Sequence, residues 1–352
     1  MTGHDPTAGQ APGHPPALPR WRVVAVALVA AVAVVGTATH LAAARRVQQE
    51  AARTAPAPQL VPLAEVSGVP RIVFVNTAPG DHQGRVAMVR RDAPGGGRAV
   101  TDLECERVYA VPGHTVCLDW TPAGVARARV HPEGAEPTAL RFTGTPSRAR
   151  LSPDGALAAT TSFVSGDSYA ADSFSTRTVV TRLGDGPGLD LESFRLVHRG
   201  SAVRPPDRNF WGVTFAADGD TFYVTVAFDG RTWLSRGSLR ERSVTTMRAD
   251  AECPSISPDG RRVAYKKQGD RVPGDWRLAV LDLATGTETV LAEQRSVDDQ
   301  VEWLDDDRVL YALPRDSGGP VLDSDVWVAA ADGSGAPRVL VRDAASPAVV
   351  RR

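Results

Sequence analysis

Hydrophobic and polar positions divide the chain into three parts. Residues 1–20 are polar and rich in Pro and Gly, and such a stretch cannot bury enough apolar surface to fold. Val23–Ala44 follows as 22 residues without a formal charge. From Val66 onward, short β-rich apolar runs such as Ile72–Val75 and Phe222–Val226 alternate with turn residues. That alternation is typical of an all-β domain.

The charge-free segment is long enough for a membrane span. It matches the ~20 residues that a helix needs to cross a bilayer, with Trp21 at one end and Arg45 at the other. We therefore predict a disordered cytoplasmic tail over residues 1–20 and a transmembrane anchor over residues 21–44. Residues 45–65, which contain three prolines, are expected to form a stalk.

A cleaved signal peptide is the alternative for the same segment. Val23–Val35 would serve as its apolar region and Ala42–Ala44 as the small-residue cleavage site. The anchor predicts a single-pass membrane protein with residues 45–352 outside the cytoplasm. The signal peptide predicts secretion of the same domain.

An internal repeat defines the domain over residues 66–352. Ser152–Gly155 reads Ser-Pro-Asp-Gly and recurs as Ser257–Gly260, and Ala216–Gly219 is a degenerate copy. Pro presets φ for the first turn position, and Asp-Gly supplies residues that tolerate positive φ. The spacing between repeats is 41 residues from Pro112 to Pro153 but 64 from Pro153 to Ala217. The longer spacing predicts an insertion between those two repeats.

Each repeat contains four short strands, which is the composition of a propeller blade. The sequence predicts six blades, over about 66–103, 104–146, 147–207, 208–250, 251–295 and 296–343. The first blade lacks an inner strand, since it starts directly at Arg71. Residues 345–350 can supply one, and ring closure by the chain end would remove exposed sheet edges.

Ser-Pro-Asp-Gly before a β-rich strand, then a third strand ending near Thr285-Gly286, resembles the repeat of TolB-type propellers. The resemblance covers roughly residues 66–350. Only two of the 40 basic residues are Lys, a bias typical of high-GC bacteria. The chain therefore resembles actinobacterial membrane-anchored TolB-like proteins, and the resemblance implies a six-bladed β-propeller outside the cytoplasm.

The three cysteines leave room for one disulfide in an oxidising compartment. Cys105 and Cys117 are 12 residues apart with a turn at Pro112–His114 between them, so they are the candidate pair. A two-residue hairpin leaves them about three residues out of register, which a bulge or an early strand start would correct. The alternative is three buried free thiols.

Candidate chemistry is sparse. The chain has no nucleophile elbow, phosphate loop or His-Glu-x-x-His motif, so no catalytic residue, metal or cofactor is predicted. A net charge of −1 gives no global field that favours nucleic acid. We expect a monomeric, non-enzymatic protein-interaction or scaffold module that binds an envelope protein. The alternative is an enzyme, or a sensor that holds a small ligand or metal in the central channel.

Polar residues at the starts of inner strands define the candidate site. In a propeller these positions converge on the channel mouth, where they can bind a ligand or simply tie the blades together. The second interpretation needs no ligand, because acidic and basic members would pair with each other. The candidates are Arg148, Arg208, Asn209, Trp211, Asp298, Asp299 and Gln300.

Overall fold

The computed structural model describes residues 28–37, 39–40, 43, 58–164, 175–184, 186–315 and 323–351. The chain separates into two compact units, Met1–Ala51 and Ala52–Arg352. In the first unit the described positions are helical, and among all described residues no helix is both long and apolar enough to cross a membrane. The predicted tail, most of the stalk and parts of the predicted anchor lie outside the described residues.

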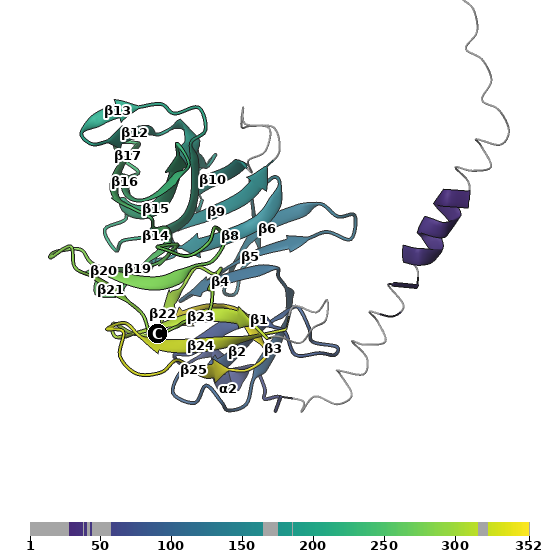
Figure 1. The fold of residues 1–352 in the computed structure, drawn as a ribbon. Helices are drawn as coiled ribbons and strands as arrows, with labels where there is room; N and C mark the ends of the chain where they lie inside the picture. The colour runs from purple at the N-terminus through teal and green to yellow at the C-terminus, as the bar shows by residue number, and fades with distance from the viewer. Residues whose placement is uncertain are drawn as a thin grey trace, which may run out of the picture. The chain divides into compact units, whose positions relative to one another are not determined.

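The second unit is a six-bladed β-propeller, as the repeat predicts (Figure 1). The four strands that build each blade pair antiparallel, and the inner strands of successive blades contact one another all the way around the ring. From the inner to the outer strand, blade one consists of β26 (Ala344–Val350), β1 (Arg71–Asn76), β2 (Arg85–Arg90) and β3 (Ala99–Glu104). Blade two consists of β4 (Arg107–Val111), β5 (His114–Trp120), β6 (Ala126–Pro132) and β7 (Thr138–Leu140).

The remaining blades follow the same order. Blade three consists of β8 (Thr145–Leu151), β9 (Leu157–Val164), β10 (Ser175–Arg182) and β11 (Leu189–Asp190). Blade four contains β14 (Asn209–Phe215), β15 (Thr221–Phe228), β16 (Arg231–Ser238) and β17 (Ser243–Ala249). Blade five consists of β18 (Glu252–Ile256), β19 (Arg262–Lys267), β20 (Arg277–Asp282) and β21 (Glu288–Val290). Blade six consists of β22 (Glu302–Trp303), β23 (Arg308–Pro314), β24 (Ser324–Ala330) and β25 (Arg338–Val341).

The chain end closes the ring. Strand β26 pairs antiparallel with β1, with Val350 opposite Arg71 and Val349 opposite Ile72. The predicted closure is therefore confirmed, and blade one is built from both ends of the propeller sequence. Ala344, Ala348, Val349 and Val350 are buried in this strand.

The long spacing between the repeats at Pro153 and Ala217 accommodates an extra hairpin on the outer side of blade four. A 3-10 turn, η1 (Leu191–Ser193), leads into β12 (Arg195–His198) and β13 (Ser201–Val203). Strand β12 runs parallel to β17 and extends this blade to six strands. The insertion thus widens one blade without changing the number of blades.

The two Ser-Pro-Asp-Gly copies form the same turn between an inner strand and the next strand. In the first, the Ser152 hydroxyl donates to Asp154 at 2.5 Å and accepts the amide of Leu157 at 2.9 Å. Gly155 donates its amide to the Ser152 carbonyl and has a φ of 72°, which favours glycine. In the second, Ser257 and Asp259 repeat this bonding. The repeat is therefore a self-contained turn that starts the second strand.

Hydrophobic cores lie between neighbouring blades. One cluster joins Ile72 and Phe74 of blade one to Leu310 and Val326 of blade six. Others join blades three and four, and blades five and six. Each sheet buries a face against its neighbour, so every junction contributes to holding the ring together.

The chain enters the propeller along the outer edge of blade one. Val61 donates its amide to the Arg98 carbonyl at 3.0 Å, and Leu60 bridges to Arg98 in parallel. A short helix, α2 (Ala64–Ser67), then buries Val66. The last part of the expected stalk is therefore packed on the sheet, because Val61 fills the space beside Gly97.

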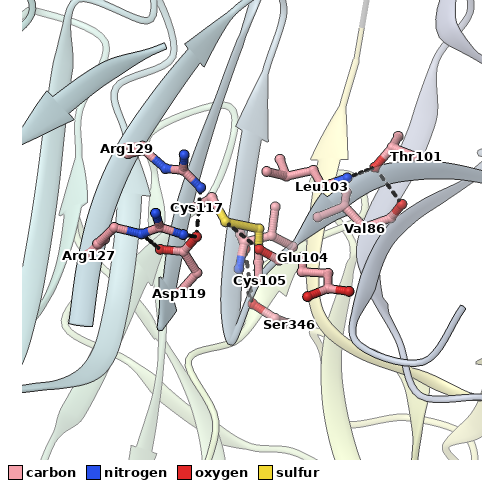
Figure 2. The surroundings of a disulfide bond; sticks show 11 residues. Val86, Thr101, Leu103, Glu104, Cys105, Cys117, Asp119, Arg127, Arg129 and Ser346 are labelled. Atoms are coloured by element: carbon pink, nitrogen blue, oxygen red, sulfur yellow. Dashed lines mark hydrogen bonds and ion pairs between the residues drawn. A yellow bond between two sulfur atoms is a disulfide. The ribbon is translucent and has the colours of Figure 1, made fainter. Parts of the chain in front are cut away.

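A disulfide joins the two cysteines that the sequence analysis pairs (Figure 2). The sulfur atoms of Cys105 and Cys117 are 2.03 Å apart and the Cα atoms 5.5 Å apart. Cys105 lies before β4, in the link from blade one, whereas Cys117 lies within β5 opposite Val108. The expected bulge or early strand start is wrong, because β4 begins at Arg107 and pairs with β5 without a shift in register. Cys105 reaches Cys117 from the link before the strand, and the bond fixes the junction of blades one and two.

Candidate functional site: the channel and its mouth

Residues 298–302 occupy the centre of the ring. They precede or begin β22, which has only two residues, whereas the other inner strands have five to seven. The segment leaves regular strand geometry before β22, and its polar side chains reach blades three, four and five. The shortness of this strand is the structural reason why polar groups converge here.

An ion pair crosses the channel. Arg150 of β8 pairs with Glu302 of β22, from the blade opposite in the ring, and donates to the Val301 carbonyl at 2.6 Å. Both side chains are buried, with 5% and 3% exposed. Arg150 also stacks 4.4 Å from the ring centre of Tyr109 in blade two, and Arg351 donates to Glu302 at 3.3 Å. One buried carboxylate thus connects blades one, three and six.

A second charged cluster lies around Asp298. Its carboxylate is 2.5 Å from Nζ of Lys266 in blade five and 3.5 Å from Arg148 in blade three. Lys266 is almost completely buried, stacks on Trp276 at 3.9 Å and lies 3.8 Å from Glu252. Partial burial opposes ionisation, but Lys266 and Arg148 hold the pKa of Asp298 below its usual value. Burial raises the pKa of Glu252 despite the nearby ammonium group.

The two neighbours of Asp298 bind backbone groups. Asp299 accepts the amides of Gln300 at 2.9 Å and Ala312 at 3.1 Å. The Gln300 side chain donates to the carbonyls of Val213 in blade four and Pro254 in blade five, at 3.1 and 2.8 Å. These contacts place Asp299 and Gln300 in the packing of the ring.

The polar candidates from blade four, Asn209 and Arg208, make their described hydrogen bonds with groups other than this cluster. Asn209 accepts the amide of Thr176 at 2.8 Å and so ties blade four to blade three. Arg208 donates to the carbonyls of Pro205 and Glu192, both at 3.0 Å. Trp211 is buried in β14. Of the seven candidates, the structure therefore brings Arg148 and Asp298 into one ion-paired cluster.

Glu302, Lys266 and Arg351 belong to the centre of the ring but were not candidates. The hydrogen bonds of Glu302 to Arg150, of Lys266 to Asp298 and of Arg351 to Glu302 span 32 to 152 residues along the chain, so spacing gave no signal for them. The sequence did contain a signal for Lys266, because it is one of only two lysines in the chain. Cation and carboxylate contacts dominate this centre, and among the described residues no group of three or more His, Cys, Asp or Glu could hold a metal ion.

Glu192 lies at the junction of blades three and four, outside the channel. It follows Asp190, whose carboxylate accepts the Glu192 amide at 2.9 Å and caps η1. Its own Oε1 is buried without a hydrogen-bond partner among the described residues. Burial, followed by the charge of Asp190, raises the pKa of Glu192 to about 9. The carboxyl group therefore keeps its proton at neutral pH.

Connections on the face with the channel mouth carry exposed apolar side chains. Because the strands of a blade alternate in direction, the links between blades and the loops between second and third strands open on the same face. Trp120 and Val125 flank such a loop in blade two, with 44% and 61% exposed, and Val272 in blade five is 69% exposed. Phe163, at the same position in blade three, is 41% exposed.

Comparison with known proteins shows the fold. No known protein-family profile matches the chain, and no curated protein matches it by sequence. TolB from Acinetobacter baumannii superposes with a TM-score of 0.59 at 15% identity, over 80% of this chain and 67% of that one. A chain of the nidogen/laminin complex superposes with a TM-score of 0.52 at 10% identity, over 80% and 98% of the two chains. The domain therefore has the fold of a TolB-like six-bladed β-propeller.

Proposed function

We propose that this chain is a non-enzymatic recognition module that binds another protein through the channel-mouth face of its propeller. The observation that carries the proposal is the set of apolar side chains exposed on that face by strand ends in blades two and three and by loops in blades two and five. Exposed apolar groups on loops of a rigid scaffold are typical of binding surfaces.

The chemistry of the channel supports recognition over catalysis. Glu302 is paired with Arg150 and Arg351, and Asp298 is paired with Lys266 and Arg148. Carboxylates that are neutralised in this way hold blades together and are poor candidates for proton transfer. The broad face around the mouth is then the part of the molecule that is free to bind.

We further propose that the propeller works outside the cytoplasm, anchored at the cell envelope by the apolar segment Val23–Ala44. The disulfide between Cys105 and Cys117 supports this location, since such bonds persist in oxidising compartments. Protease added to intact spheroplasts should degrade the propeller while a cytoplasmic marker survives. Protection of the C-terminus would contradict the external location.

The binding face can be tested by site-specific crosslinking in cells. A photoreactive residue at position 120 or 272 should give a discrete adduct with a partner protein. The same residue at position 261 is the matched control, because Arg261 is exposed on the turn between β18 and β19, on the opposite face.

Substitution tests the same face in a second way. A Trp120→Ser, Val272→Ser double variant should keep its melting temperature and lose the adducts formed from a third position, 125. Val290→Ser, at an equally exposed valine on an outer strand, should keep them. Adducts from position 261 alone, or adducts unaffected by the double substitution, would contradict the proposal.

A further inference from the structure

A pocket of about 430 Å³ opens between blades three and four, on the face opposite the channel mouth. Its lining comes from the start of β9, the end of β10 and the link to β11 in blade three. Blade four contributes Gly219 and Asp220 of its first turn, with Leu239 and Arg240 after β16. The volume lies in the ~300–1,000 Å³ range of small-molecule sites.

The first turn of blade four leaves open space beside it, whereas first turns at two other blade junctions make close contacts. Between blades two and three, a Cβ at Gly155 would lie 2.6 Å from the His114 ring. Between blades five and six, Asp306 accepts the amide of Asp259 at 3.0 Å. At Gly219, the equivalent turn of blade four, a Cβ would meet no atom within 4 Å. A Cβ at Gly260 in blade five would also meet no atom within 4 Å, but the pocket lies beside Gly219, at the junction that carries the insertion.

The walls of the pocket are apolar. Leu157, Val180, Leu189 and Leu239 line it and also belong to the core between blades three and four. Leu157, Val180 and Leu239 are at most 8% exposed and Leu189 is half-buried, so a ligand would gain binding free energy from the limited apolar area that stays exposed.

Two arginines stand at the rim. Arg182 and Arg240 are exposed, and no ion pair or side-chain hydrogen bond of either is found among the described residues, although Asp154 acts on Arg182 at longer range. The carboxylate in the lining, Asp220, is already bonded to the Ser238 hydroxyl at 2.8 Å and the Arg240 amide at 2.7 Å. The rim therefore offers two guanidinium groups to a ligand, and guanidinium groups favour carboxylate and phosphate.

We propose that this pocket binds a small amphipathic anion, with its apolar body against the four aliphatic side chains and its anionic head between Arg182 and Arg240. The site is separate from the channel-mouth face. It would give the propeller a small-molecule input independent of the proposed protein partner.

The test is a titration of the full-length chain with three probes of one shape: 3-phenylpropionate, 3-phenylpropanol and 3-phenylpropylamine. Methyl NMR signals of Leu and Val report binding at the pocket itself. We expect saturable shifts at Leu239 and Val180 with 3-phenylpropionate, weaker binding of the alcohol and the weakest binding of the amine.

Two variants separate the head-group contact from the apolar contact. An Arg182→Gln, Arg240→Gln double variant should weaken 3-phenylpropionate about tenfold and leave the alcohol unchanged, whereas Arg261→Gln on the same face should change neither. Leu239→Trp should block all three probes. If Leu239→Trp misfolds, the Arg182→Gln, Arg240→Gln double variant still tests the proposal, because both of its substitutions are at exposed residues. Equal binding of the three probes, shifts away from the pocket, or an unchanged double variant would overturn the proposal.

Discussion

In the part of the chain that the structure describes, buried carboxyl groups are paired with basic side chains at the centre of the ring but not at the junction between blades three and four. In the centre, the buried Glu302 faces Arg150 and Arg351, and Asp298 faces Lys266. At the junction, Oε1 of Glu192 has no hydrogen-bond partner among the described residues and the carboxyl group stays protonated at neutral pH. One region is closed by complementary charges, whereas the other leaves one carboxyl oxygen buried without a partner among the described residues.

This difference indicates that the ion pairs at the centre of the ring stabilise the propeller, whereas the junction is less optimised. Removing one member of a buried ion pair leaves a charge that nothing compensates, so the centre tolerates little change. The junction carries the insertion β12–β13 and already contains unsatisfied groups. We therefore expect substitutions at the centre to destabilise and a chosen substitution at the junction to stabilise.

The largest effect should come from opening the ring at its closure. Deleting residues 344–352 removes β26, and with it the backbone pairing to β1 and the burial of Val349 and Val350. We expect a loss on the order of 5–10 kcal/mol in the free energy of unfolding, measured by urea denaturation. Removal of Arg352 alone is the control. An unchanged urea midpoint in the long deletion would show that blade one stands without its inner strand.

A smaller loss should follow from breaking the pair across the channel. Glu302→Gln leaves the buried Arg150 without its counter-charge and should cost about 3–5 kcal/mol. Asp298→Asn is the matched control, because its carboxylate is 62% exposed and Glu252 remains 3.8 Å from Lys266; it should cost about 1 kcal/mol. Equal losses in the two variants would mean that the Arg150–Glu302 pair contributes no more to the free energy of unfolding than the exposed Asp298 contacts do.

The smallest effect, and of opposite sign, is expected at the junction. The folded-state pKa of Glu192, about 9, lies above the ordinary value of 4.5. Between these pH values the folded chain holds a proton that the unfolded chain has released, so stability falls as pH rises through this window. Glu192→Gln removes that dependence and should stabilise the protein by about 2 kcal/mol at pH 6.

The comparison for this variant is thermal denaturation across pH. The gain of Glu192→Gln should vanish below pH 4, where the acid is protonated in both states. Glu241→Gln, at an exposed glutamate of the same blade, should show no gain at any pH. A stability difference for Glu192→Gln that does not vary with pH would argue against a protonated carboxyl group at this position.

Local signals account for what the sequence could predict. The turns at Ser152–Gly155 and Ser257–Gly260 are held by their own hydrogen bonds, so the local sequence is enough to predict them. Together with the degenerate copies of this turn they indicate the number of blades. The missing strand before Arg71 predicts closure by residues 345–350.

The pairing at the centre was only partly predictable. Converging inner strands brought Arg148 and Asp298 together as candidates, and the structure joins them. The pair between Arg150 and Glu302 spans 152 residues, and nothing local marks two strands that face each other across a ring. Arg208 and Asn209 also precede or begin an inner strand, but their side chains bond to neighbouring loops and blades.

The closure by β26 also sets the order of events during synthesis. The partner of β1 is β26, which follows all five other blades along the chain, so blade one cannot complete its sheet until those five blades have been synthesised. Blades two to six can pair from neighbouring segments as they emerge, because their strands are consecutive or nearly so. A truncated product therefore keeps an unpaired edge in blade one, which quality-control proteases and chaperones can distinguish from the finished ring.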